Sequence, residues 1–268
     1  MQPTVAVIGA GAMGEAILRG LVAAGWPPAA VTATDTDRPK LDKIGVELGI
    51  VTTDDAAEAI VGRDVVVVVV KPSHVTDVLT AIASTLLPTQ VVLSVAAGVP
   101  TSTFESRLPG VPIVRAMPNT PALLGAGAAA IAPGSHAERR HLDMATAILG
   151  AVGVVTEVPE EMIDAVTAVS GSGPAYVFLL SEAMQAAGRE LGLPSEVAEK
   201  LVNQTILGAG RMLTETATDA ATLRQRVTSP NGTTAAALDT FAHGGFTGLV
   251  TRAVAAAERR SRELGRES

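Results

Sequence analysis

Six consecutive valines at residues 65–70 place the strongest constraint on how this 268-residue chain can fold. A strand that is apolar at every position, and not only at alternate positions, is buried on both faces of its sheet. Similar runs rich in β-branched residues occur at residues 4–8, 31–34, 91–95 and 113–114. Because segments of helical pattern such as residues 14–24 separate these runs, the first half is predicted to be an α/β unit with a parallel sheet.

The chain changes character after Pro159. Residues 128–131 and 152–155 are predicted to be the last strands of the sheet, and the pattern beyond them is helical. The expected helices cover residues 162–169, 175–191, 195–215, 219–226, 233–243 and 246–264. Glycine and proline are expected to separate these helices at residues 171–174, 192–194, 229–232 and 244–245. The sequence therefore predicts two domains, residues 1–158 and an all-α domain at residues 159–268.

Composition excludes several classes of protein. Apolar residues make up 47% of the chain, which favours a packed core over disorder. The net charge of −7 and the pI of 5.1 argue against nucleic acid as a partner, because phosphate binding needs a basic face. The absence of cysteine excludes disulfides, cysteine-bound zinc and a thiol nucleophile. The four histidines lack metal-ligand spacing, so no metal site is predicted.

The first residues show no targeting segment, since they run directly into a predicted strand. The longest wholly apolar run, residues 65–70, is too short to span a bilayer. We therefore expect a cytoplasmic protein that does not bind membranes.

The expected helices of the second domain, for example around residues 206–210, are apolar around much of their circumference. A helical domain of roughly a hundred residues cannot cover that much apolar surface by itself. The sequence therefore predicts a homodimer that forms through this domain.

A complete G-x-G-x-x-G fingerprint at residues 9–14 connects the first predicted strand to the first predicted helix. In this context the glycines permit a tight turn, a close approach of the backbone to a pyrophosphate, and helix–strand packing. The amide groups at the start of the helix then face the phosphates. The residues expected to bind NADPH or NADH in this Rossmann-type domain are Gly9, Gly11, Ala12, Met13 and Gly14.

The end of the second strand is where such domains distinguish NADH from NADPH. Asp35 follows Thr34 at the position where an acid binds the ribose 2′-hydroxyl. An acid there repels a 2′-phosphate and favours NADH, whereas Arg38 close by could pair with that phosphate. Asp35 could also be a simple turn residue. Both cofactors therefore stay open, with Thr34 and Asp35 as candidate contacts.

Three further segments follow predicted strands, at the edge where ligands bind in open α/β sheets. The candidate cofactor contacts there are Val70, Lys71, Pro72, Ala96, Ala97 and Asn119. Small residues such as the two alanines would let a cofactor pass close to the backbone. Asn119 could hold a ribose or the nicotinamide amide, or it could form an Asx-turn before Pro121.

Three motifs further along the chain are longer and more distinctive. They are AMPNTP at residues 116–121, AVTAVSGSGPAY at residues 165–176 and VTSPNGTT at residues 227–234. With the fingerprint and the VKP at residues 70–72, they closely resemble the pyrroline-5-carboxylate reductase family over residues 5–264. The resemblance implies reduction of the cyclic imine 1-pyrroline-5-carboxylate to L-proline by NAD(P)H, the last step of proline biosynthesis. It also implies a helical domain that dimerises, with dimers often assembling into a ring.

Residues 229–234 precede and open the predicted helix at residues 233–243. A helix N-terminus after a glycine turn offers free N–H groups and a positive dipole end, which suits a carboxylate, although a plain Ser/Thr cap has the same pattern. The resemblance implies that Thr234 hydrogen-bonds the ring nitrogen of the substrate. It also implies that Ser229 and the Gly232–Thr233 backbone bind the substrate carboxylate. Thr234 and Ser229 are thus the candidate catalytic residues.

Two positions near the expected site are ambiguous. Asn231 stands where the family usually has glycine. Asparagine tolerates the left-handed conformation better than most side chains, so the loop is expected to keep its shape. The resemblance brings Glu160 near the bound ligands, but an acid in the first turn of a helix commonly serves the helix alone, which we favour.

Two alternative functions compete with the reductase. A β-hydroxyacid dehydrogenase has the same two-domain plan, but that family places a catalytic lysine shortly after a Gly-x-Gly. Here residues 171–173 are followed by no lysine before Lys200. A non-catalytic nicotinamide sensor would keep the fingerprint without needing residues 229–234. A protonated imine accepts hydride readily, so a reductase needs mainly to hold its substrate and cofactor in position.

Overall fold

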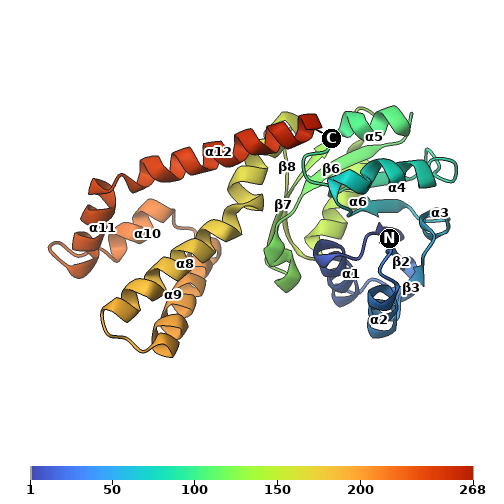
Figure 1. Ribbon diagram of the computed structural model, residues 1–268. Helices are drawn as coiled ribbons and strands as arrows, with labels where there is room; N and C mark the ends of the chain where they lie inside the picture. The colour runs from blue at the N-terminus through green and yellow to red at the C-terminus, as the bar shows by residue number, and fades with distance from the viewer. Residues whose placement is uncertain (1, 268) are drawn as a thin grey trace. The chain divides into compact units, whose positions relative to one another are not determined.

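The structure is a computed structural model that describes residues 2–267 (Figure 1). By their contacts these residues group into two compact units, residues 2–172 with 256–267, and residues 173–255. The C-terminal residues join the first unit because Ser261 donates a 2.7 Å hydrogen bond to Asp164 and Gly265 packs on the carbonyl of Gly98. The units therefore divide after Ser172, later than the predicted domain boundary at residue 158.

The first unit is built on an eight-stranded sheet with the order β3-β2-β1-β4-β5-β6-β7-β8. The strands are β1 (Val5–Ile8), β2 (Val31–Thr34), β3 (Val51–Thr53), β4 (Val65–Val68), β5 (Val91–Ser94), β6 (Ile113–Met117), β7 (Gly127–Pro133) and β8 (Gly153–Glu157). Every residue of β1, β2, β4 and β5 is buried. The Rossmann-type α/β unit predicted from the apolar runs is therefore confirmed.

Two features of the sheet depart from the sequence prediction. The sequence does not predict β3, because its three residues are partly exposed and carry no apolar run. The parallel sheet also contains one antiparallel pair that the sequence does not predict, because β7 is antiparallel to β6. Only residues 118–126 connect these two strands, and a parallel connection requires a crossover of about a dozen or more residues.

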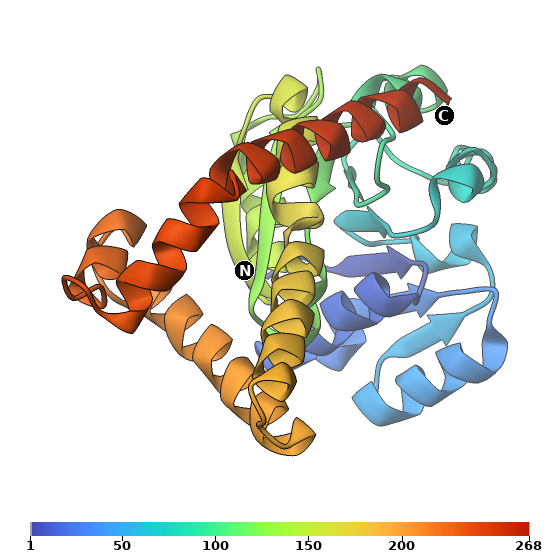
Figure 2. The ribbon, with the colours of Figure 1, turned by 60° about the vertical axis from the view of Figure 1, so that its left-hand side comes forward.

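Helices cover both faces of this sheet (Figures 1 and 2). On one face lie α1 (Ala12–Ala23), α2 (Arg38–Leu48) and α6 (Arg139–Gly150), which share one apolar cluster with the strands. On the other face, α4 (Val75–Ile82) and α5 (Thr101–Arg107) form a second cluster. The shorter helical segments are η1 (Pro28–Ala30), α3 (Ala56–Ala59), η2 (Pro72–His74), η3 (Thr120–Leu124), η4 (Glu160–Met162) and α7 (Ile163–Val166). With both faces covered, the carboxyl edge of the strands is left to the loops that carry the predicted site.

A buried histidine caps the start of α6. The Nδ1 atom of His141 accepts a 2.9 Å hydrogen bond from the N–H of Glu138. Burial lowers the pKa of His141 from its ordinary value of 6.5, and the charge of Arg140 adds to this effect while Glu138 opposes it. The fold therefore holds the neutral imidazole, which is the form that can accept this bond.

Stability is expected to depend on pH through His141. A histidine whose pKa is lowered by folding contributes stability above its unfolded pKa, near 6.5, and this stability is lost as the pH falls. His141→Gln can accept the same bond without titrating, so it should flatten the fall in Tm below neutral pH. The difference should be a few degrees, roughly what 1 kcal/mol is worth at this size. Calorimetry across this pH range checks it, with His136→Gln, at an exposed histidine, as control; equal slopes in wild type and His141→Gln would contradict the prediction.

The second unit contains only helices among the residues described. They are α8 (Gly173–Glu190), α9 (Ser195–Glu215), α10 (Ala220–Arg226), α11 (Thr233–His243) and the first part of α12 (Phe246–Glu267). The bounds predicted for α9 and α11 are confirmed. α8 and α9 lie side by side (Figure 1), and the hydroxyl of Ser181 donates a 3.1 Å hydrogen bond to Asn203.

One predicted helix break is wrong. Residues 171–174 do not separate two helices, because a π-helical turn, Thr167–Gly171, continues the helical backbone into α8. The N–H of Ser172 donates to the Thr167 carbonyl, five residues back, at 2.8 Å. Pro174 has no N–H to donate to the Ser170 carbonyl four residues back, and that carbonyl instead accepts a 3.1 Å hydrogen bond from the Asn119 side chain. Gly171 is required for space, since a Cβ there would overlap the Met117 side chain, whereas a Cβ on Gly173 would meet nothing.

The second unit buries little apolar surface by itself. Among its residues only Ser181, Ala198 and Val202 are buried. The large exposed apolar side chains include Phe178, Leu179, Leu201, Leu207, Val227 and Leu249. Helical residues Glu160–Glu190 are long and apolar enough to cross a membrane, by length and composition alone. A helix covered by another protein chain satisfies the same two criteria, and exposed apolar faces of this kind mark protein interfaces.

Candidate functional site

Two glycines of the fingerprint loop are required for close packing against backbone carbonyls. Gly9 has a φ of +103°, and a Cβ there would overlap the carbonyl of Val69 beside it. A Cβ on Gly14 would overlap the carbonyl of Gly9 in the same way. These two positions hold α1 tightly against the carboxyl ends of β1 and β4, as the sequence predicts.

Gly11 has a different role from its two neighbours in the fingerprint. It is the N-cap residue of α1, no side chain caps the helix there, and a Cβ would meet nothing within 4 Å. The first intrahelical bond is donated by Glu15, so the amides of Ala12, Met13 and Gly14 have no acceptor among the described residues. Free amides beside an open space fit the pyrophosphate of a dinucleotide.

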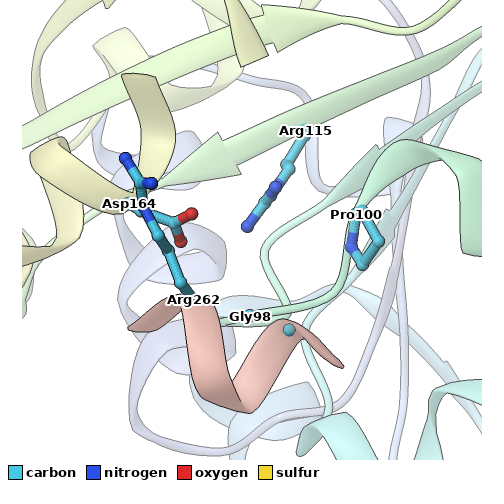
Figure 3. A pocket seen from close by; sticks show the side chains of 6 residues that line it. Gly98, Pro100, Arg115, Asp164 and Arg262 are labelled. Atoms are coloured by element: carbon cyan, nitrogen blue, oxygen red, sulfur yellow. The ribbon is translucent and has the colours of Figure 1, made fainter. Parts of the chain in front are cut away.

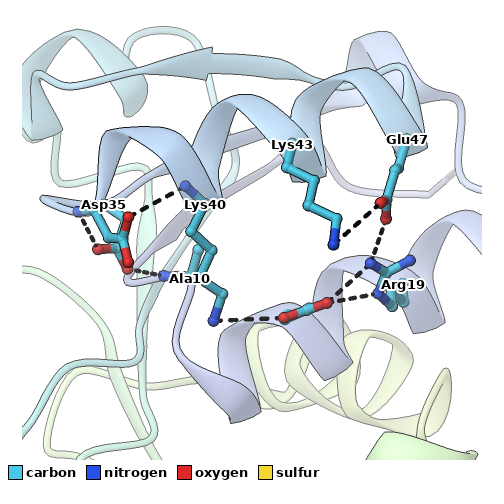
Figure 4. A network of polar contacts seen from close by, with 8 residues as sticks. Ala10, Arg19, Asp35, Lys40, Lys43 and Glu47 are labelled. Carbon is cyan, nitrogen blue, oxygen red and sulfur yellow. Dashed lines mark hydrogen bonds and ion pairs between the residues drawn. The ribbon is translucent and has the colours of Figure 1, made fainter.

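The carboxylate of Asp35 accepts hydrogen bonds from two backbone N–H groups (Figure 4). Its Oδ2 accepts a 2.5 Å hydrogen bond from the N–H of Ala10, and its Oδ1 accepts a 2.8 Å bond from the N–H of Asp37. Thr34 is buried, and its carbonyl accepts a 2.8 Å bond from the N–H of Gly9. Both residues therefore hold the fingerprint loop in place, whatever contact they make with a cofactor.

The segments that follow β4 and β5 meet the fingerprint loop at the same edge. The N–H of Val69 bonds to the carbonyl of Ile8, and the N–H of Val95 bonds to that of Val68, so the ladder continues past the strands. The predicted contacts beyond this point are Val70, Lys71, Pro72, Ala96 and Ala97, of which Ala96 is buried and Val70 half-buried. The structure thus brings these residues together with Gly9 and Gly11.

Asn119 bridges three elements of the first unit and does not form the alternative Asx-turn. Its side-chain amide donates to the carbonyl and hydroxyl of Ser170 at 3.1 and 3.3 Å. Its Oδ1 accepts a 2.9 Å bond from the N–H of Ala128, at the start of β7. These three bonds fix the loop after β6, so the side chain is a structural anchor of that loop.

Glu160 caps a helix other than its own. Its carboxylate accepts bonds from the N–H and the hydroxyl of Thr101, at 2.8 and 2.5 Å, and pairs at 3.1 Å with the buried guanidinium of Arg115. Thr101 begins α5, directly after the loop that carries Ala96 and Ala97. Glu160 therefore fixes this loop. The sequence signal that could reveal the pair is an arginine within an apolar strand, which requires a buried acid.

A pocket lies beside this ion pair, between Arg115, Asp164, Arg262 and the Gly98 loop (Figure 3). The charges around it are already paired, because Arg262 contacts Glu258 and Asp164 accepts from Ser261. The pocket therefore belongs to the packing of the C-terminal helix on the first unit.

The loop at residues 229–234 has the expected shape. Asn231 has a φ of +57° and is the one non-glycine residue with positive φ among those described. A Cβ on Gly232 would overlap the Ser229 hydroxyl oxygen, so a glycine is required there. Asn231 therefore adopts the left-handed conformation that asparagine tolerates better than most side chains.

The same loop leaves the start of α11 uncapped. Gly232 is the N-cap residue and no side chain bonds to the first turn, so the plain Ser/Thr cap considered from the sequence is absent. The first intrahelical bond is donated by Ala236. The amides of Thr233 and Thr234 and the Thr234 hydroxyl have no partner among the described residues. These donors suit an anionic group with an adjacent polar atom.

The two parts of the chain match two family models. Residues 160–264 match a model described as pyrroline-5-carboxylate reductase dimerisation. Residues 4–98 match a model described as NADP oxidoreductase coenzyme F420-dependent. No group of three or more histidine, aspartate or glutamate residues that could hold a metal occurs in the described part of the chain.

Known proteins resemble the chain over nearly its full length. Curated pyrroline-5-carboxylate reductases from Pseudomonas aeruginosa and Mycobacterium tuberculosis are 45% and 42% identical, covering 99% and 97% of this chain and 98% and 96% of theirs. The solved reductase from Coxiella burnetii is 39% identical, with a TM-score of 0.95 over 98% of this chain and 99% of that one. The Plasmodium falciparum pyrroline carboxylate reductase, solved with NADP bound, is 27% identical, with a TM-score of 0.85 over 98% of both chains.

Proposed function

The chain belongs to the pyrroline-5-carboxylate reductase family, and we propose that it reduces the cyclic imine 1-pyrroline-5-carboxylate to L-proline with NADH or NADPH. The observation that carries this proposal is the uncapped start of α11 at residues 229–234, which offers donors to a small anion. A nicotinamide sensor would have no use for this second set of donors. The absence of a lysine after residues 171–173 disfavours the β-hydroxyacid dehydrogenase.

Different groups of the loop at residues 229–234 bind the carboxylate and the ring nitrogen of the imine. Ser229 and the N–H of Thr233 bind the carboxylate, and the hydroxyl of Thr234 hydrogen-bonds the ring nitrogen. The expected carboxylate contact of the Gly232 backbone needs correction, because its N–H already donates to the Ser229 carbonyl at 3.0 Å and so shapes the turn. Hydride adds to C2, the imine carbon of 1-pyrroline-5-carboxylate, while the C=N π electrons return to the nitrogen, which keeps its proton and becomes the amine of proline. The chain therefore needs no strong general acid, and its contribution is to position the reacting atoms.

The proposed cofactor residues form two groups, one around the pyrophosphate and one along the carboxyl edge of the sheet. Gly9, Gly11 and Gly14 shape the loop, while the amides of Ala12 and Met13 bind the pyrophosphate. Along the edge, the residues beside the dinucleotide are Val70, Lys71, Pro72, Ala96, Ala97 and Asn119. When bound, the dinucleotide supplies the hydride, and the small alanines allow its close approach to the backbone.

The second unit assembles copies of the chain. A match to the family's dimerisation model and the exposed apolar helices support a homodimer. A ring of dimers is the further assembly proposed, on the family resemblance. The net charge of −7 supports partners other than nucleic acid, and a cytoplasmic location without membrane binding completes the proposal.

Steady-state oxidation of NADH and NADPH with 1-pyrroline-5-carboxylate tests the reaction. We expect turnover with at least one cofactor and formation of L-proline. Cofactor binding without turnover would contradict the proposal and favour the sensor, whereas oxidation of 3-hydroxy acids with NAD⁺ or NADP⁺ would favour the dehydrogenase.

A further inference from the structure

Both oxygens of the Asp35 carboxylate already accept hydrogen bonds within the protein. One oxygen accepts from Ala10 in the fingerprint loop and the other from Asp37 in the turn after β2, at 2.5 and 2.8 Å. The hydrogen bond between Asp35 and Ala10 joins two residues far apart in sequence, so it fixes the position of the fingerprint loop. A carboxylate in this role supports the pyrophosphate site, which NADH and NADPH share.

The start of α2 offers no free backbone donor to a 2′-phosphate. The N–H of Arg38 donates to the Thr36 carbonyl at 3.2 Å, and Pro39 has no N–H. The N–H of Lys40 donates to the Asp37 carboxylate at 3.2 Å. The N–H and the hydroxyl of Thr36, between β2 and α2, have no partner among the described residues, so a phosphate at the end of β2 would combine these two donors with side-chain cations.

Both cations near this turn are held by acids. Arg38 pairs with Asp54 at 2.9 Å and with Asp42 at 3.5 Å. Lys40 pairs with Glu15 at 3.4 Å (Figure 4), and the side-chain hydrogen bond from Arg19 lowers the pKa of Glu15, which keeps that carboxylate charged. A 2′-phosphate would have to displace Asp54 from Arg38, in surroundings that already carry excess negative charge.

We infer that Asp35 is a positioning residue for the fingerprint loop, and that the Arg38–Asp54 ion pair shifts the choice between NADH and NADPH toward NADH. The inference rests on the proposed function only in requiring a nicotinamide dinucleotide as ligand. The pair is about half exposed on the arginine side, so it opposes NADPH by a modest factor. Exposed pairs of this kind change an equilibrium by about fivefold at most.

The test is a fluorescence titration of the full chain with NADH and with NADPH, without imine. Asp54→Asn is expected to tighten NADPH binding by about two- to fivefold while leaving NADH binding unchanged. Asp35→Asn, which loses one acceptor oxygen, is expected to weaken both cofactors by the same factor. Asp143→Asn is the matched control, because Asp143 forms the same kind of exposed pair with Arg139 on α6.

Three results would overturn the inference. They are a wild type that binds NADPH as tightly as NADH, an Asp54→Asn variant with an unchanged ratio, and an Asp35→Asn variant that selectively gains NADPH affinity. The last result would show that Asp35 contacts the ribose of the cofactor directly. Asp54 is exposed, so its variant remains informative if Asp35→Asn fails to fold. Because the readout is binding, a chain that binds dinucleotides but does not reduce the imine would refute the proposed function alone.

Discussion

Gly11→Ala is expected to lose most of its affinity for the dinucleotide while remaining folded. A Cβ at residue 11 meets no protein atom within 4 Å, so the apo protein has room for it. The same methyl group would occupy the space beside the free amides of Ala12 and Met13, where the pyrophosphate binds. Losing one charge-assisted hydrogen bond costs about 1.5–3 kcal/mol, so Kd for either cofactor should rise about 10- to 100-fold. Fluorescence titration with NADH measures this change.

Gly14→Ala is the matched comparison within the same fingerprint. Its Cβ would overlap the carbonyl of Gly9, so the loop or α1 must shift. This variant should lose stability, by about 1–3 kcal/mol on the scale of overpacked interiors, whereas Gly11→Ala should lose less than about 1 kcal/mol. Thermal unfolding separates the two effects. A stable Gly11→Ala protein with normal cofactor affinity would show that the pyrophosphate does not approach residue 11.

The fold could be predicted where burial leaves a local pattern in the sequence. The valines of β4 and the apolar residues of β1 and β5 are buried on both faces, and this is why they appear as uninterrupted runs. β3 lies at the sheet edge and is half exposed, so it leaves no such pattern. The Gly-Ser-Gly-Pro segment resembles a turn, yet Gly171 serves close packing against Met117, a contact between residues distant in sequence.

The site could be predicted only in part, because only some of its features leave a local pattern in the sequence. The fingerprint and the loop at residues 229–234 are local motifs with local causes, a backbone close approach and a helix N-terminus. The role of Asp35 depends on whether its carboxylate faces Ala10 or the ribose, which its position in the sequence does not decide. The pair of Arg115 and Glu160 joins residues from two distant segments, so neither partner identifies the other in sequence.

Thr234→Ala is expected to reduce kcat/KM for the imine by about 10- to 100-fold, with cofactor affinity unchanged. The proposed role of its hydroxyl is to hydrogen-bond the ring nitrogen that carries the proton during hydride addition. Hydrogen bonds to charged groups contribute about 1.5–3 kcal/mol, and about 1.4 kcal/mol corresponds to a tenfold change in rate. The hydroxyl has no partner among the described residues, so its removal should not disturb the fold.

A threonine on the same helix provides the control for this prediction. The hydroxyl of Thr240 donates to the carbonyl of Ala236 at 3.0 Å and is exposed, so Thr240→Ala changes α11 in the same chemical way without touching its N-terminus. Thr234→Ser keeps the hydroxyl and should recover most of the lost kcat/KM, which a role in packing alone would not produce. If Thr234→Ala and Thr240→Ala have the same kcat/KM, Thr234 does not contact the substrate, and the free amides at the start of α11 must bind it without that side chain.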